Sequence, residues 1–204
     1  MRDNKNMMSL EKCGIEIIGG QIMSRVTVKD VETEDVAATY KVVVPKSIGA
    51  NGKVNADEMP EENLRAIPDA KRVTEVGDIV MKLSTPYDAG RVEEASAGCI
   101  VPSFCAIIKS SDTLDSGYLL AFLNSNACKN QLKAQVAGSV MAMLSVGKIK
   151  NVMIPVPGPE KQKEISEHFL ETQRRLAIIE QIIALEQKKN DIYFRELVNE
   201  YGEE

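Results

Sequence analysis

Four consecutive residues in the middle of the chain come closest to a known catalytic pattern. Residues Ser84–Tyr87 read Ser-Thr-Pro-Tyr, whereas methyltransferases that modify the amino group of adenine use Asp, Asn or Ser followed by Pro-Pro and an aromatic residue. In such a site, oxygen atoms accept hydrogen bonds from the exocyclic amine, and the aromatic ring stacks on a flipped base. The chain has Thr85 where the pattern has proline, and it has neither a GxGxxG turn nor a βαβ pattern for S-adenosylmethionine. We therefore interpret Ser84–Tyr87 as the end of a strand that enters a loop.

The sequence offers little for nucleophilic or metal chemistry. His168 is the only histidine, and it falls within a predicted long helix, where a solvated side chain is the simpler interpretation. The cysteines Cys13, Cys99, Cys105 and Cys128 are widely spaced without a CxxC pair, and they mostly fall in apolar runs that favour buried, inert thiols. We predict no catalytic residue, no metal site and no cofactor.

Length and charge limit the class of protein. A chain of 204 residues is long enough to bury a hydrophobic core without cross-links. Its formal net charge of −5 argues against a protein that coats nucleic acid by bulk electrostatic attraction, although a local basic loop stays compatible with it. Charged residues interrupt the N-terminal region, so no run has the length of a signal peptide or a membrane span. We expect a cytoplasmic protein with no membrane contact.

Residues 1–157 have the pattern of a mostly β domain with short helices. Short runs rich in valine and isoleucine, such as "GDIVMKL" and "GCIVPSFCAIIK", alternate with glycine, proline and asparagine turn signals. Apolar periodicity predicts one helix over residues 115–136, capped by Asp115 or Ser116, and a second short helix after Ser145.

Residues 158–204 have the pattern of one long helix, which makes the predicted fold class α+β. Ten positions follow a heptad spacing, and seven of them are apolar: Ile165, Phe169, Thr172, Leu176, Ile179, Ile183, Glu186, Asn190, Tyr193 and Leu197. A second apolar line consists of Ile178, Ile182, Leu185 and Ile192. Such a helix is about 60 Å long, whereas a compact domain of the preceding size is about 30 Å wide. Part of the helix must therefore project, which favours a coiled coil between chains over folding back on the same domain.

Several strings, in their order and spacing, resemble one half of a specificity subunit of a type I restriction-modification system. The strings are "VVVPKSIGANGKVNADEM", "VTEVGDIVMKLS", "YLLAFLNSNACKNQL" and "AGSVMAMLSVGKIKNVMIPVPGPEKQKEI". The resemblance spans nearly the whole chain and includes Gln162 and the segment Ile154–Pro157. Members of the family normally have two recognition domains and two helices, and this chain has the pattern of one of each.

The resemblance implies a non-catalytic subunit. Residues 1–157 would be a target recognition domain that reads double-stranded DNA, and residues 158–204 would space the domains and hold the methyltransferase subunits. Where the system also cleaves DNA, restriction subunits would join the assembly. Because the helices run antiparallel in the family, two half-length chains would form a homodimer through the heptad residues Ile165, Phe169, Leu176, Ile179, Ile183, Asn190, Tyr193 and Leu197, with Thr172, Glu186 and Asn190 fixing the register.

Loops rich in lysine, arginine and small polar residues are the predicted DNA contacts. These residues are Lys46, Ser47, Lys53, Lys82, Ser84, Thr85, Tyr87, Arg91, Ser139 and Met141. Two other classes of function stay open at this point: a coiled-coil adaptor that no longer binds DNA, which would agree with the acidic charge, and a stand-alone adenine methyltransferase.

Overall fold

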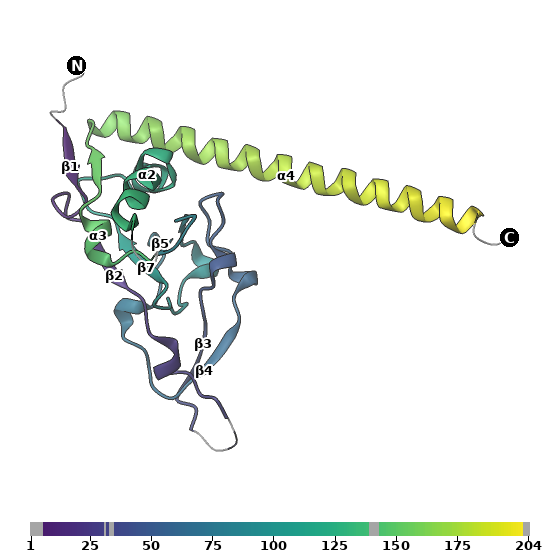
Figure 1. The fold of residues 1–204 in the computed structure, drawn as a ribbon, viewed down its shortest axis with the longest axis horizontal. Helices are drawn as coiled ribbons and strands as arrows, with labels where there is room; N and C mark the ends of the chain where they lie inside the picture. Colours follow the sequence, from purple (N-terminus) through teal and green to yellow (C-terminus); the bar gives the residue numbers. More distant parts are fainter. Residues whose placement is uncertain (1–5, 31, 33–34, 139–142, 202–204) are drawn as a thin grey trace.

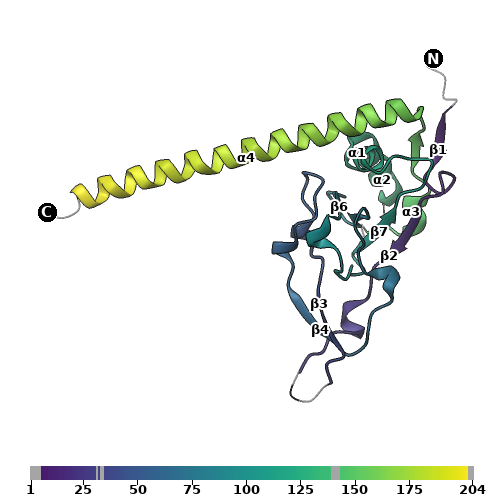
Figure 2. The ribbon, with the colours of Figure 1, turned by 180° about the vertical axis from the view of Figure 1, so that it is seen from behind.

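The computed structural model describes residues 6–30, 32, 35–138 and 143–201. These residues form a β-rich domain at one end of the molecule and a single long helix that extends far beyond it (Figure 1). Seen from the opposite side, the domain again lies against only the first part of that helix (Figure 2). The predicted α+β class with a long C-terminal helix is confirmed.

The regular elements are short except for the last helix. The strands are β1 (Met7–Ser9), β2 (Glu16–Gly19), β3 (Ala38–Lys41), β4 (Glu61–Leu64), β5 (Ile79–Lys82), β6 (Ala89–Arg91), β7 (Cys105–Lys109) and β8 (Met153–Pro155). The α-helices are α1 (Ser116–Asn124), α2 (Asn126–Val136), α3 (Val146–Lys150) and α4 (Pro159–Tyr201). The short 3-10 helices are η1 (Met23–Arg25), η2 (Pro45–Ser47), η3 (Ala56–Glu58), η4 (Ala70–Arg72) and η5 (Glu94–Ser96).

The central sheet has four antiparallel strands in the order β2-β7-β5-β6. Successive side chains of a strand point to opposite faces of the sheet. Ile79 and Met81 of β5 therefore join the core cluster that contains residues of α1 and α2, whereas Val80 and Ile107 join a second cluster. Burial on both faces explains why β5 and β7 are continuous apolar runs in the sequence.

Two smaller strand pairs extend the domain in opposite directions. β3 pairs with β4 at the end of the domain that lies away from α4 (Figure 1). That pair is attached through a small buried cluster of Val42, Leu64 and Ile100. β1 pairs with β8, so the first strand of the chain lies beside the residues that lead into α4.

The helix predicted over residues 115–136 is two helices in the structure. Asp115 caps α1, since its carboxylate accepts a hydrogen bond from the Tyr118 backbone N–H at 2.8 Å. Ser125 then has an extended backbone with ψ of 151°, and its hydroxyl accepts from the Cys128 N–H at 3.2 Å. A serine in this position is a strong helix start signal, and it separates α1 from α2. The short helix predicted after Ser145 is α3, capped by the Ser145 side chain.

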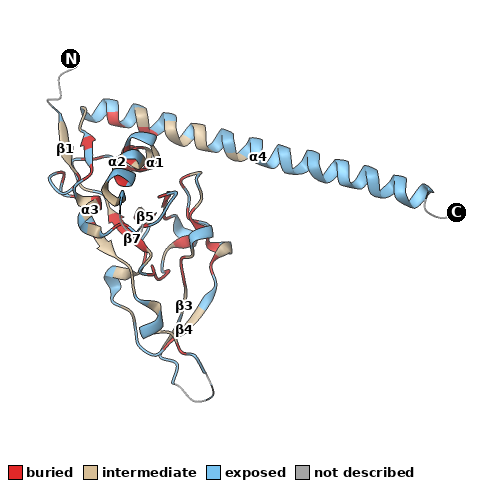
Figure 3. Cartoon of the chain, viewed as in Figure 1, coloured by how far each residue is buried: buried red, intermediate tan, exposed pale blue. Residues whose placement is uncertain are grey.

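The first part of α4 is fixed to the domain by buried polar side chains. The Gln162 side-chain amide donates to the carbonyl oxygens of Thr113 and Pro157 at 3.2 and 3.0 Å, and its oxygen accepts from the Asp115 N–H at 2.8 Å. One turn later, Ser166 lies against Gly117 of α1 so closely that a Cβ at Gly117 would be only 3.1 Å from the Ser166 Cβ and would overlap its Oγ. Some residues of α4 between Phe169 and Ala177 are half-buried, and from Ile178 onward the helix is exposed along its length (Figure 3).

Replacing Gly117 by alanine is expected to destabilise the protein by about 1–3 kcal/mol, because the added methyl group overpacks the α1–α4 contact. The matched control is Gly147→Ala. Gly147 is also the second residue of a helix, but no atom lies within 4 Å of its Cβ position, so this change should be neutral or slightly stabilising. Chemical denaturation of both variants provides the measurement. Adding Ser166→Ala to Gly117→Ala should recover part of the loss, and a Gly117→Ala protein as stable as the parent would contradict the close packing.

Candidate nucleic-acid interface

The first predicted DNA-contact group lies around the turn Gly49–Lys53. This turn is closed by backbone hydrogen bonds from the Gly49 N–H to the Lys53 carbonyl and from the Gly52 N–H to the Gly49 carbonyl. Lys46 pairs with Glu58 at 3.0 Å, and Lys53 pairs with Glu93 at 3.2 Å. Ser47 is fully buried, and its hydroxyl donates to the Val44 carbonyl at 2.7 Å. Ser47 therefore stabilises the loop and has no surface from which to contact DNA.

A surface cavity of about 460 Å³ lies between these two lysines. Its charged lining residues are Lys46, Lys53, Asp57, Glu58 and Glu93. Since the carboxylates outnumber the ammonium groups, this cavity is a poor site for phosphate.

The second predicted group follows β5. The Ser84 and Thr85 side chains are exposed in the loop after the strand, as the sequence predicts. Tyr87, by contrast, is only 1% exposed and belongs to the main core cluster. An aromatic ring that is packed in the core cannot stack on a flipped base, so the structure gives no support to Ser84–Tyr87 as a catalytic tetrapeptide.

Lys82 belongs to a partly buried ion cluster. Asp88 accepts hydrogen bonds from Lys82 at 3.0 Å and from Lys129 of α2 at 2.7 Å, and all three side chains are largely covered. Burial alone would raise the pKa of the Asp88 carboxyl, but the hydrogen bonds from Lys129 and Lys82 hold it below its ordinary value. Because the Lys82 charge is already compensated, this lysine primarily connects β5, β6 and α2.

Three predicted DNA-contact residues remain: Arg91, Ser139 and Met141. Arg91 lines a groove of about 320 Å³ between the Gly49–Lys53 turn and α4, together with Leu170 and Arg174. Ser139 and Met141 lie outside the described residues. The segment that follows them is joined to the β5 loop, because the Leu144 N–H donates to the Leu83 carbonyl at 2.8 Å.

The predicted dimerisation residues divide into two groups along α4. Ile165 and Phe169 are partly buried and pack against the core of their own domain. Farther along, the apolar heptad side chains are exposed to between 39% at Leu197 and 63% at Tyr193, and Asn190 is exposed between them. The second apolar line is exposed as well: Ile178, Ile182, Leu185 and Ile192. Within the described residues, a largely exposed apolar surface thus begins at Leu176.

The structure also brings together basic residues that the sequence does not suggest as a group. We name the segments 21–29 and 63–73 the basic lobe; they hold five basic residues and one acidic residue. Backbone hydrogen bonds join them, from the Arg65 N–H to the Val26 carbonyl at 2.9 Å and from the Val28 N–H to the Asn63 carbonyl at 2.8 Å. Lys71 and Arg72 follow Arg25 by 46 and 47 positions in the sequence, so only the pairing of the two segments reveals the lobe.

The described residues include all four cysteines and the single histidine of the sequence. Within them, no group of three or more His, Cys, Asp or Glu side chains could hold a metal ion. The cysteines are buried, and burial raises the pKa of the Cys105 and Cys128 thiols to about 12, which keeps them protonated. None of the described helices is long and apolar enough to cross a bilayer.

Comparisons with known proteins agree on the fold. A family model described as the type I restriction modification DNA specificity domain matches residues 69–187. A structure from a study of complex assembly in the type I R-M system has a TM-score of 0.64 and 16% identity, and the match covers 95% of this chain and 44% of that chain. The HsdS subunit from Thermoanaerobacter tengcongensis has a TM-score of 0.58 and 18% identity, with 92% and 49% covered.

The type I restriction-modification S subunit from M. genitalium has a TM-score of 0.57 and 15% identity, with 98% of this chain and 48% of that chain covered. The chain thus spans less than half the length of these three solved structures. No match to the chain was found among curated protein sequences.

Replacing Asp88 by asparagine should destabilise the protein by about 2 kcal/mol at neutral pH, because it leaves Lys82 and Lys129 without a counter-charge in a largely covered site. The lowered pKa of Asp88 means that its ion pairs contribute stability above the ordinary value of 3.8, and this contribution is lost as the pH falls through the folded-state pKa. Denaturant titrations at several pH values should therefore show the difference between parent and variant shrinking in acid. The exposed Asp112 provides the control Asp112→Asn, which should cost much less stability than Asp88→Asn at neutral pH.

Proposed function

Because the chain belongs to the family of type I restriction modification DNA specificity domains, we propose that it is the DNA-recognition subunit of an adenine methyltransferase complex. In this proposal the β-rich domain binds one half-site of duplex DNA, and separate methyltransferase subunits supply S-adenosylmethionine and the chemistry. The observation that supports it best is the combination of the family match with a fold shared over 92% or more of this chain with the three solved structures. The buried Tyr87 agrees with the assignment of catalysis to another subunit.

A homodimer would provide two recognition domains. The chain has one β-rich domain and one long helix, and its match covers 44% to 49% of the related chains. The large apolar side chains of α4 from Leu176 onward are each 39% or more exposed in the described part of the chain. Two copies paired antiparallel through this surface would place one domain at each end of the helix pair and relate them by a twofold axis.

Two polar residues interrupt the apolar heptad positions of this surface, Glu186 and Asn190. Their burial in a helix pair is acceptable only where each finds a polar partner, so they restrict the register at some cost in stability. The exposed heptad positions would therefore determine the register in which two copies of α4 pair, as well as the pairing itself.

A helix pair leaves the second apolar line on the outside. Ile178, Ile182 and Leu185 are each more than half exposed, and they do not belong to the heptad positions that face the second copy. We assign this line to the methyltransferase subunits, which would complete a bundle of helices around α4.

The function is tested by co-expressing the chain with the methyltransferase subunits of its own system and mapping methylated adenines by sequencing. The expected result is methylation at an interrupted palindrome, because identical readers related by a twofold axis recognise identical half-sites in opposite orientation. Omitting the chain should abolish methylation. Methylation that persists without it, or methylation by the chain alone, would contradict the assignment as a recognition subunit.

The dimer is tested by placing charge in its centre. Ile179→Asp with Ile183→Asp should convert the dimer into a monomer, because the helix pair would bury two carboxylates without partners. Sedimentation of the purified chain at tens of micromolar concentration gives the answer. The control is Gln181→Asp, which adds a carboxylate to the same helix outside both apolar lines and should leave the dimer intact. A parent protein that sediments as a monomer would exclude the homodimer.

A further inference from the structure

Three basic side chains of the basic lobe differ from the lysines of the predicted DNA-contact loops. No carboxylate lies within ion-pairing distance of Arg25, Lys71 or Arg72 among the described residues. Arg72 instead donates to the Gln21 side-chain oxygen at 2.6 Å. Asp69, the acidic residue of the lobe, accepts from the backbone N–H of Lys71 at 3.0 Å as the cap of η4. The lobe therefore keeps an uncompensated positive charge in a chain whose net charge is −5.

The lobe is held rigidly against the rest of the domain. Backbone hydrogen bonds of 2.7 Å run from the Gln21 N–H to the Val101 carbonyl and from the Ser103 N–H to the Gln21 carbonyl. The Val101 N–H in turn donates to the Arg72 carbonyl at 2.9 Å. A basic surface whose backbone is already fixed loses little conformational entropy on binding.

An exposed apolar side chain lies in the same loop as these charges. Ile67 is 76% exposed, the most exposed of the large apolar side chains in the described residues, and Pro68 follows it. Ile22, at 41% exposure, belongs to the other segment of the lobe. Exposed aliphatic side chains in the same two segments as arginine and lysine suit a ligand that combines phosphates with apolar groups, and duplex DNA presents both, as backbone phosphates and as the methyl groups of thymine.

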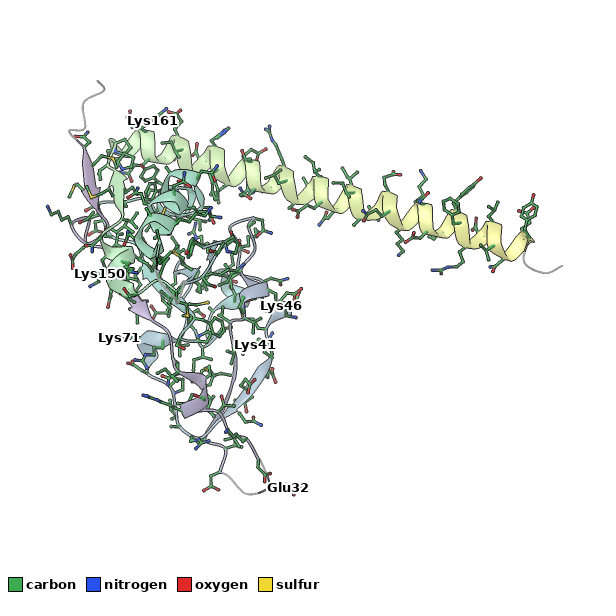
Figure 4. All side chains as sticks on the ribbon, viewed as in Figure 1. Glu32, Lys41, Lys46, Lys71, Lys150 and Lys161 are labelled. Atoms are coloured by element: carbon green, nitrogen blue, oxygen red, sulfur yellow. The ribbon has the colours of Figure 1, made fainter. Side chains whose placement is uncertain are left out.

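We infer that the basic lobe is the surface that binds duplex DNA, an inference that rests on the proposed function. Arg25 and Lys71 bind backbone phosphates, Arg72 is positioned by Gln21 to do the same, and Ile67 contacts base edges in the major groove. Figure 4 shows Lys71 on the opposite side of the domain from Lys46. The basic lobe and the Gly49–Lys53 turn are thus separate surfaces, and an experiment can distinguish them.

The phosphate contacts are tested with the complete methyltransferase complex and a random-sequence DNA duplex. The double variant Arg25→Ala with Lys71→Ala should lower the affinity at low salt and reduce the slope of log affinity against log salt by about 2, since each lost phosphate contact removes about 0.9. The matched variant is Lys46→Ala with Lys53→Ala, which also removes two positive charges and should leave the slope unchanged.

The base contact is tested by mapping methylated sites in cells. Ile67→Ser should relax the sequence preference at one position of each half-site by about tenfold while methylation elsewhere in the motif persists. The control is Val76→Ser, because Val76 is a comparably exposed aliphatic residue at 61% and lies outside the lobe.

The results of these experiments distinguish a failure of the proposed DNA-recognition function from a failure of the lobe assignment. If the parent complex neither binds the duplex nor methylates DNA, the proposed function fails and the lobe assignment fails with it. If the parent complex binds and methylates, but the Arg25 and Lys71 variant retains its salt slope or Ile67→Ser retains the motif, the lobe assignment alone is overturned. A reduced slope in the Lys46 and Lys53 variant would instead locate the DNA at the Gly49–Lys53 turn.

Discussion

The orientation of α4 depends on one close helix contact, between Gly117 of α1 and Ser166 of α4. Only a residue without a side chain permits the two backbones to approach so closely. The three hydrogen bonds of Gln162 lie one turn earlier on the same helix and join it to the residues just before α1 and α4. Because both contacts are buried, the helix leaves the domain in a fixed direction. The direction in which the exposed part of α4 leaves the domain follows from this junction.

Positive charge is used in two different ways in the domain. Lys82 and Lys129 surround Asp88, and their charges hold together β5, β6 and α2. Lys46 and Lys53 have carboxylate partners at the surface, whereas Arg25 and Lys71 have none among the described residues. At physiological salt an exposed charge acts over about 8 Å. The arrangement of charges within one surface therefore matters more for a polyanionic ligand than the net charge of the whole chain.

Local signals in the sequence predict much of the fold and less of the interface. Asp115 and Ser145 cap the helices expected at those positions, and the heptad pattern predicts α4. A lysine beside a glycine turn does not reveal whether a glutamate from another segment lies next to it, so Lys46, Lys53 and Lys82 could not be distinguished from unpaired lysines. The same limit hides the burial of Ser47 and Tyr87, which depends on tertiary packing, and the meeting of residues 21–29 with 63–73, which depends on pairing between distant segments.

In the proposed homodimer, the rigid junction would make the register of the helix pair equivalent to a distance between its two β-rich domains. In an antiparallel pair, each residue added between the junction at Ser166 and the twofold axis moves both domains outward, by about 1.5 Å each. The separation thus changes by about 3 Å per residue, close to the rise of roughly 3.4 Å per base pair of duplex DNA. A slip of the pairing that preserved the heptad pattern would change the separation by several base pairs. In that proposed pair, Glu186 and Asn190 would restrict the alignments that α4 accepts, so the two polar side chains that weaken the pair would also define the spacing of the half-sites.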